Sequence, residues 1–155
     1  MDLNKLKNDI DKFIGSINIP DISCCEDDTK SYHAYNELDK LYDDNKKEEY
    51  NINLFNYDLN ELSNKLNVDY DNLLNLYINN QIPSKGLSIA IMMVMGLDIN
   101  RINDRLHLLK YNLGNSISDK IIRYFIINDI RDIDLLNEIL ISYGQMYLFS
   151  RKKLR

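Results

Sequence analysis

Glycine and proline are scarce in this chain of 155 residues, which contains five Gly and two Pro. So few turn-forming residues exclude an all-β fold, because short strands need a turn signal about every 8–12 residues. The scarcity of glycine also excludes a phosphate-cradling loop, and neither GxGxxG nor GxSxG occurs. We therefore expect a helical protein without a nucleotide-binding loop.

Residues that bind metals or catalyse reactions are equally few. The two cysteines, Cys24 and Cys25, are adjacent, and the two histidines, His33 and His107, lie far apart. A zinc site needs about four ligands, and neighbouring cysteines are poor disulfide partners. Carboxylate pairs such as Asp27–Asp28 lie in charged segments without apolar neighbours that would tune them for acid–base chemistry. The sequence predicts no catalytic residue, no metal site and no cofactor, so we expect a protein that is not an enzyme.

Long apolar runs are missing as well. The longest, from Leu87 to Leu97, is interrupted by Ser88 and Gly96, whereas a membrane helix needs about 20 apolar residues. The charged N-terminus leads into no apolar segment, so we expect no signal peptide, no membrane span and a cytoplasmic protein. The net charge of −5 excludes non-specific nucleic-acid binding by the whole surface, although not a local contact.

The N-terminal residues show helical spacing, which predicts an amphipathic helix over residues 1–19. The apolar residues recur every three or four positions, as Leu3, Leu6, Ile10, Phe13 and Ile17. Docking of this stripe on the main domain is the favoured interpretation, and homodimerisation is the alternative. Residues 20–30 follow as an acidic loop, and helical spacing resumes at residue 31.

From residue 58 onward, helices are expected at short intervals. Asp58 is an expected N-cap, and Asn67 with Val68 breaks the helix that it begins. Asp69 caps the next expected helix, and Ser84 caps a very apolar one that ends at Gly96. Since that last helix is apolar on all sides, we expect it to be buried.

A short pattern repeats along the chain. Residues 98–106 match residues 132–140 at an offset of 34, and residues 58–66 form a looser third copy. Each copy is an acidic cap followed by apolar residues at i, i+3 and i+7. Between the later two lies another expected buried helix, with Ile121, Ile122, Phe125 and Ile126. The sequence thus predicts an all-α fold, with a second packed helical half over residues 97–155 and a basic tail from Arg151 to Arg155.

The stretch from Asn60 to Ser84 resembles the helix-turn-helix of lambda-repressor-like (Xre-type) regulators of Gram-positive bacteria. Residues 61–68, ELSNKLNV, are similar to its second helix and turn, with Asn67 where the family commonly has Gly. Residues 69–77 lie where the family has its recognition helix. Residues 79–84, NNQIPS, look like the segment that follows this helix in the family, which reads NGxxxPS. Later pieces follow in the family's order: Pro83-Ser84-Lys85, Gly96-Leu97, Leu108-Leu109-Lys110-Tyr111, Asp119-Lys120-Ile121-Ile122 and Asn137-Glu138-Ile139-Leu140.

This resemblance implies a helix-turn-helix bundle over residues 31–96, with an insertion at 43–57, that regulates transcription by binding double-stranded DNA. The implied DNA-contacting residues are Tyr70, Asn72 and Asn75, together with Gln81 and Lys85. Asparagine side chains can read adenine edges through two hydrogen bonds.

A second function remains open, because the expected recognition helix carries Asp69 and Asp71 and no basic residue. The motif would then be a scaffold for an adaptor or inhibitor that binds a basic protein surface through these two carboxylates. Basic residues lie elsewhere, at Arg101 and Arg105 and in the tail. We interpret the two arginines as balancing Asp98 and Asp104 on a solvated helix face. The alternative is that the arginines or the tail bind the DNA backbone or an acidic partner.

Overall fold

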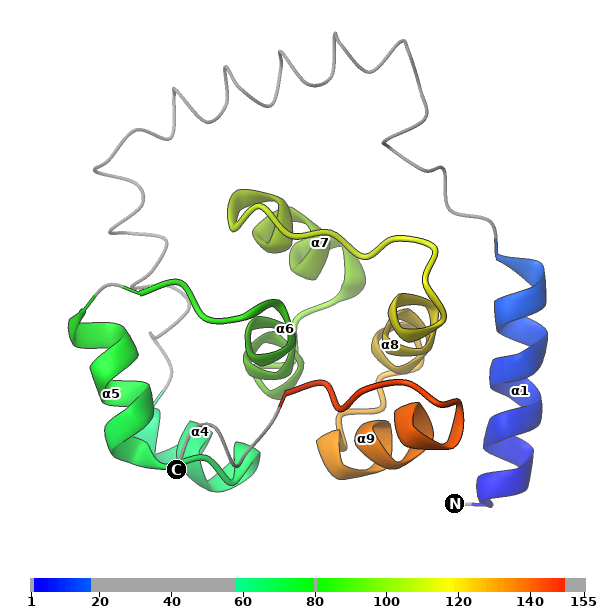
Figure 1. The fold of residues 1–155 in the computed structure, drawn as a ribbon, viewed down its shortest axis with the longest axis horizontal. Coiled ribbons are helices and arrows are strands. Elements are labelled where there is room, and N and C mark those ends of the chain that lie inside the picture. Colours follow the sequence, from blue (N-terminus) through cyan, green and yellow to red (C-terminus); the bar gives the residue numbers. More distant parts are fainter. Residues whose placement is uncertain (1, 18–57, 80, 150–155) are drawn as a thin grey trace, which may run out of the picture.

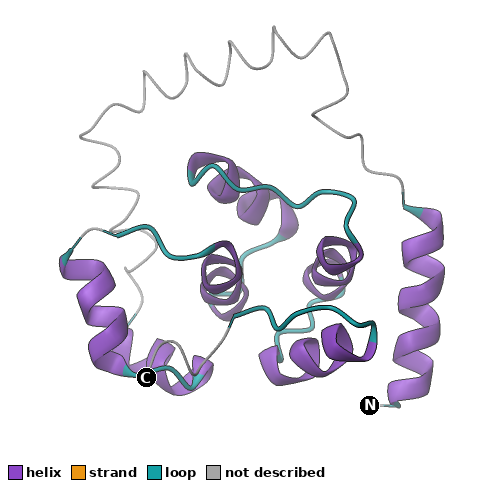
Figure 2. Ribbon diagram, in the orientation of Figure 1, coloured by secondary structure: helices purple, strands orange, loops and turns teal. Residues whose placement is uncertain are grey.

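The computed structural model describes residues 2–17, 58–79 and 81–149, and these residues form helices and connecting loops without strands (Figures 1 and 2). The predicted all-α fold is confirmed. The helices are α1 (Leu3–Ser16), α4 (Leu59–Leu66), α5 (Tyr70–Ile78), α6 (Lys85–Val94), α7 (Ile99–Leu108), α8 (Ile117–Ile127) and α9 (Ile133–Ser142).

The helices begin at the capping residues that the sequence predicted. Asp58, Asp98 and Asp132 accept hydrogen bonds from the first-turn amides of α4, α7 and α9, at 2.9–3.0 Å. Such side-chain acceptors satisfy amides that have no partner within the helix. The repeated pattern therefore corresponds to three capped helices whose i+3 and i+7 residues are buried, as Leu62, Leu66, Ile102, Leu106, Leu136 and Leu140.

Helix α6 forms the centre of the molecule, between α4 and α7 (Figure 1). Seven consecutive side chains, from Leu87 to Met93, are buried, which confirms the expectation of a helix covered on all sides. The same hydrophobic core includes Leu62 of α4 and Ile139 of α9. The two halves of the chain therefore share one core.

Helix α1 docks against α8 at the edge of the molecule (Figure 1). Leu6 and Ile10 are buried, and the ring of Phe13 packs edge-on against Tyr124 with centroids 5.4 Å apart. Docking, the favoured interpretation of this stripe, is confirmed. The helix is shorter than the predicted range of residues 1–19, because Ile17 adopts an extended conformation and ends it.

Several sequence predictions fall outside the described residues: the acidic loop at 20–30, the helix from residue 31, the insertion at 43–57 and the basic tail. Cys24, Cys25 and His33 lie there too. Within the described ranges, no helix is long and apolar enough to cross a membrane.

Candidate nucleic-acid interface

Helices α4 and α5 are joined by a tight turn that the sequence located correctly. Asn67 adopts the left-handed conformation (φ 52°, ψ 47°), which asparagine tolerates better than most residues. The amide of Val68 donates to the carbonyl of Ser63 at 3.0 Å, and the hydroxyl of Ser63 donates to the carbonyl of Val68 at 2.6 Å. The side chain of Val68 is also buried. The two hydrogen bonds and this buried side chain together fix the orientation of α5 relative to α4.

Helix α5 lies on the edge of the molecule opposite α1 (Figure 1). Leu73 is fully buried and anchors it to the core, while Leu74 and Leu76 are half-buried. The opposite side of the helix faces solvent, where it can meet a partner.

The solvent-facing stripe of α5 consists of Asp71, Asn75 and Ile78, which are exposed at i, i+4 and i+7. Asn75, one of the predicted contact residues, lies at the centre of this stripe. Tyr70 and Asn72 are half-buried and flank it. Sequence reasoning missed Ile78, although its spacing from Asp71 and Asn75 places it on the same face.

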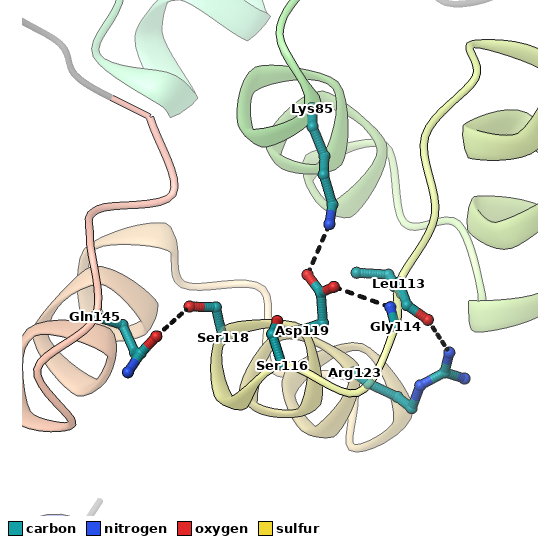
Figure 3. A network of polar contacts seen from close by, with 8 residues as sticks. All are labelled: Lys85, Leu113, Gly114, Ser116, Ser118, Asp119, Arg123 and Gln145. Carbon is teal, nitrogen blue, oxygen red and sulfur yellow. Dashed lines mark hydrogen bonds and ion pairs between the residues drawn. The ribbon is translucent and has the colours of Figure 1, made fainter. Parts of the chain in front are cut away.

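Gln81 and Lys85, the other two predicted contacts, differ in environment. Gln81 is exposed in the turn after α5. The ammonium of Lys85 lies 2.8 Å from the carboxylate of Asp119, whose side chain is only 11% exposed (Figure 3). The structure thus gives Lys85 an internal partner and places its side chain between α6 and α8.

The Asp119 carboxylate is the centre of a polar network at the start of α8 (Figure 3). Its second oxygen accepts from the amide of Gly114 at 2.9 Å. Nearby, the Arg123 guanidinium donates to the carbonyl of Leu113 at 3.2 Å. Burial lowers the pKa of Arg123, and the charge of Asp119 opposes that shift. This network holds the loop before α8 against the first turn of α6.

The electrostatics of α5 are dominated by its first turn. Asp69 and Asp71 are exposed, and the residues from Tyr70 to Ile78 include no basic side chain. Asp69 accepts a hydrogen bond from the amide of Asp71 at 3.1 Å, so it is also the N-cap of the helix. The nearest basic residue in the preceding helix, Lys65, forms an ion pair with Glu61 at 2.9 Å.

The two arginines of α7 are not equivalent. Arg101 is exposed and lies 3.9 Å from the carboxylate of Asp98, in agreement with charge balance on a solvated face. Arg105 is half-buried, and its Nη1 atom is buried without a hydrogen-bond partner among the residues that the structure describes. The interpretation of a fully solvated arginine pair is therefore corrected for Arg105, whose side chain is partly covered.

His107 is half-buried on α7. Over residues 2–17, 58–79 and 81–149, no group of three or more His, Cys, Asp or Glu side chains lies in an arrangement that would hold a metal ion.

No protein-family model, no curated protein and no solved structure matches this chain.

Proposed function

We propose that this chain is a non-enzymatic, cytoplasmic helix-turn-helix protein that regulates transcription by binding double-stranded DNA through α5. The observation that carries the proposal is the α4–turn–α5 arrangement. A second helix that follows a three- to four-residue turn and lies on the molecular surface is the element that such proteins insert into the major groove.

The polar residues of α5 support this proposal. Asn75 is exposed at the centre of the stripe, and Asn72 flanks it nearer the N-terminus of the helix. The N-terminal residues of recognition helices contact base edges, and asparagine pairs with adenine through N6 and N7. Contacts from Tyr70 and Gln81 at either side of these amides complete the proposed site.

Binding of a basic protein is the second candidate function, favoured by the two exposed carboxylates at the first turn of α5. Phosphate contacts supply most of the affinity of DNA-binding proteins, and they require cations. Asp69 and Asp71 would repel phosphates, whereas they complement a lysine- or arginine-rich surface. An adaptor or inhibitor of that kind would use the same helix for a different partner.

The first experiment is a fluorescence-anisotropy titration of the full chain with DNA from upstream of its own gene. It is run at about 50 and 200 mM salt with non-specific competitor, because phosphate contacts make affinity strongly salt-dependent. Saturable, sequence-selective binding supports the regulator. Absence of binding at the lower salt concentration rejects it and favours the basic protein partner.

Variants of α5 then separate the two functions. Asn75→Ala is expected to weaken specific DNA binding by about tenfold or more, because a bidentate base contact contributes roughly 1–3 kcal/mol. Asn100→Ala, an exposed asparagine on α7, serves as the matched control and should have no effect.

The carboxylates need variants that leave the helix intact. Asp69→Ser retains a capping oxygen, and Asp71→Asn retains the shape of the side chain, so the pair removes two charges without uncapping α5. The double variant should strengthen DNA binding if the protein is a regulator, and it should abolish association with a basic partner if the protein is an adaptor.

A further inference from the structure

The segment that follows α9 returns to the start of α6 (Figure 1). The backbone of Leu148 occupies the space where a Cβ atom on Gly86, in the first turn of α6, would lie. Phe149, the last residue before the basic tail and Ser150, is buried in the core. The described part of the chain therefore ends at a fixed point beside the N-terminus of α6.

The chain also arrives at the start of α6 directly from α5. The amide of Gln81 donates to the carbonyl of Leu76 at 3.0 Å, so the turn after α5 begins against the last turn of that helix. Gly86 follows five residues later, and five residues span at most about 18 Å. The point where the described chain ends is thus close to the end of the proposed DNA-binding helix.

The basic tail follows from this fixed point, and its own residues lie outside the described ranges. Its sequence, RKKLR, contains four basic residues, and no acidic residue occurs after Glu138. Without these four, the 19 Lys and Arg residues of the chain fall to 15, against 24 Asp and Glu residues. The tail is therefore the most positive five-residue segment of an acidic protein.

Helix α5 lacks the cations that a phosphate backbone requires. Residues 69–84 contain no Lys or Arg. The basic residues that border this stretch, Lys65 and Lys85, each pair with a carboxylate, at 2.9 and 2.8 Å. Because phosphate contacts supply much of the affinity of DNA-binding proteins, the positive charge has to come from another part of the chain.

We propose that the basic tail supplies phosphate contacts beside α5, by binding the DNA backbone that flanks the groove in which α5 lies. This inference rests on the proposed function. The six residues after Phe149 span up to about 20 Å, which is enough to reach the turn after α5 from the start of α6. Contacts to phosphate carry no sequence information, so the tail contributes affinity while α5 contributes specificity.

A variant with a neutral tail tests the proposal. It combines four substitutions, Arg151→Gln, Lys152→Gln, Lys153→Gln and Arg155→Gln. The matched control makes the same change of charge at four exposed residues of α1 and the α7 region, Lys5→Gln, Lys12→Gln, Arg101→Gln and Lys110→Gln. Both variants carry a net charge of −9 in place of −5, so any difference between them reports the position of the charges.

Fluorescence anisotropy of the full chain is measured with DNA from upstream of its own gene and with an unrelated duplex of equal length, at about 50–200 mM salt. The neutral tail should weaken binding of both duplexes by the same factor, at least about tenfold at the lowest salt concentration. It should also make the slope of log K against log salt shallower by about 3–4, as expected for four lost phosphate contacts. The control variant should stay within about threefold of the wild type, because salt screens distant charges.

The outcomes separate this inference from the proposed function. A wild-type chain that binds neither duplex rejects the regulator, and the inference with it. A wild-type chain that binds while the neutral-tail variant keeps its affinity and salt slope overturns the inference alone. Tighter DNA binding by that variant also overturns it, since the tail would then cover Asp69 and Asp71 of its own chain. Loss confined to the upstream DNA overturns it as well, because the tail would then contact bases.

Discussion

At the residue scale, Gly86 shows how closely the start of α6 packs against the segment that follows α9. A Cβ atom added to this residue would lie 1.5 Å from the carbonyl oxygen of Leu148. Leu148 is fixed in turn, because its amide donates to the side chain of Asn137 at 2.8 Å. The residue must be glycine because backbone, and not a flexible side chain, occupies the space.

We predict that Gly86→Ala lowers the free energy of unfolding by about 3 kcal/mol, since the backbone around residue 148 must move away from α6. The matched control is Gly15→Ala on α1, where the added Cβ would meet nothing within 4 Å apart from its chain neighbours and the backbone of its own helix. That change should raise stability by about 0.5 kcal/mol through helix propensity. Urea unfolding of both variants measures the contrast, and equal effects would contradict the close approach.

Tyr143 links α1 to the end of α9. Its hydroxyl donates to the carboxylate of Asp11 at 2.5 Å and lies 3.2 Å from the carbonyl of Lys7. Burial, the hydrogen bond to Asp11 and the charge of Asp11 raise the pKa of Tyr143 to about 12. The folded protein therefore holds the neutral phenol more strongly than the unfolded chain, in which tyrosine ionises near pH 10.

We predict that this contribution to stability is complete below pH 10 and is lost as the pH rises from 10 to about 12. Tyr143→Phe should cost about 1 kcal/mol at pH 7, through the lost hydrogen bond. The difference between the wild type and the variant should shrink above pH 10, as measured by urea unfolding across the alkaline range. A difference that stays constant up to pH 12 would contradict the raised pKa.

At the element scale, α1 is part of the core and not an appendage. Ile10 is fully buried against the rest of the protein, while Leu3, on the first turn, is 39% exposed. The alternative role of this stripe, as a dimerisation surface, would leave Ile10 exposed in the monomer.

We predict that Ile10→Ala lowers the free energy of unfolding by about 3 kcal/mol, as expected for a large-to-small change in a packed core. Leu3→Ala should cost less than about 1 kcal/mol, because its side chain is partly solvated already. Thermal or urea unfolding at a concentration where the protein is monomeric distinguishes the two. An insensitive Ile10→Ala variant would indicate that α1 does not dock.

The first residues of the helices were predictable, because N-capping depends on residues close in sequence. Asp58, Asp69, Ser84, Asp98 and Asp132 each bond an amide two or three residues further along the chain. The end of α1 was less predictable. The apolar spacing continues to Ile17 and predicts a helix up to residue 19, but the extended conformation of Ile17 ends it earlier.

At the scale of the whole molecule, three polar contacts join the segment around α6 to the second helical half. Lys85 pairs with Asp119, and the hydroxyl of Tyr111 donates to the carbonyl of Pro83 at 2.9 Å. Arg131 donates to the carbonyl of Met93, in the last turn of α6, at 3.4 Å. Together with the shared core, these contacts make the α4–α5 motif and the second half one structural unit.

We predict a single unfolding transition for residues of both halves, with coincident curves by circular dichroism and tyrosine fluorescence. Asp119→Ala should lower the free energy of unfolding by about 2 kcal/mol, because it leaves Lys85 and the Gly114 amide without their acceptor. In a double-mutant cycle with Lys85→Met, the coupling between the two residues should be about 1 kcal/mol. Two separate transitions would show that the halves fold independently.

The sequence by itself determined the helical fold, the helix starts, the turn at Asn67 and the buried character of α6. These features depend on apolar spacing and on side chains that bond neighbouring amides, and both are local. It also indicated Asn75 as a candidate contact residue. Only the tertiary structure decided that Lys85 has an internal partner, that Gly86 underlies Leu148 and that Ile78 shares the exposed stripe of α5. The ion pair of Lys85 and the close approach at Gly86 depend on groups that are 34 and 62 residues apart in the sequence and meet only through packing. The exposure of Ile78 depends on which face of α5 the core covers.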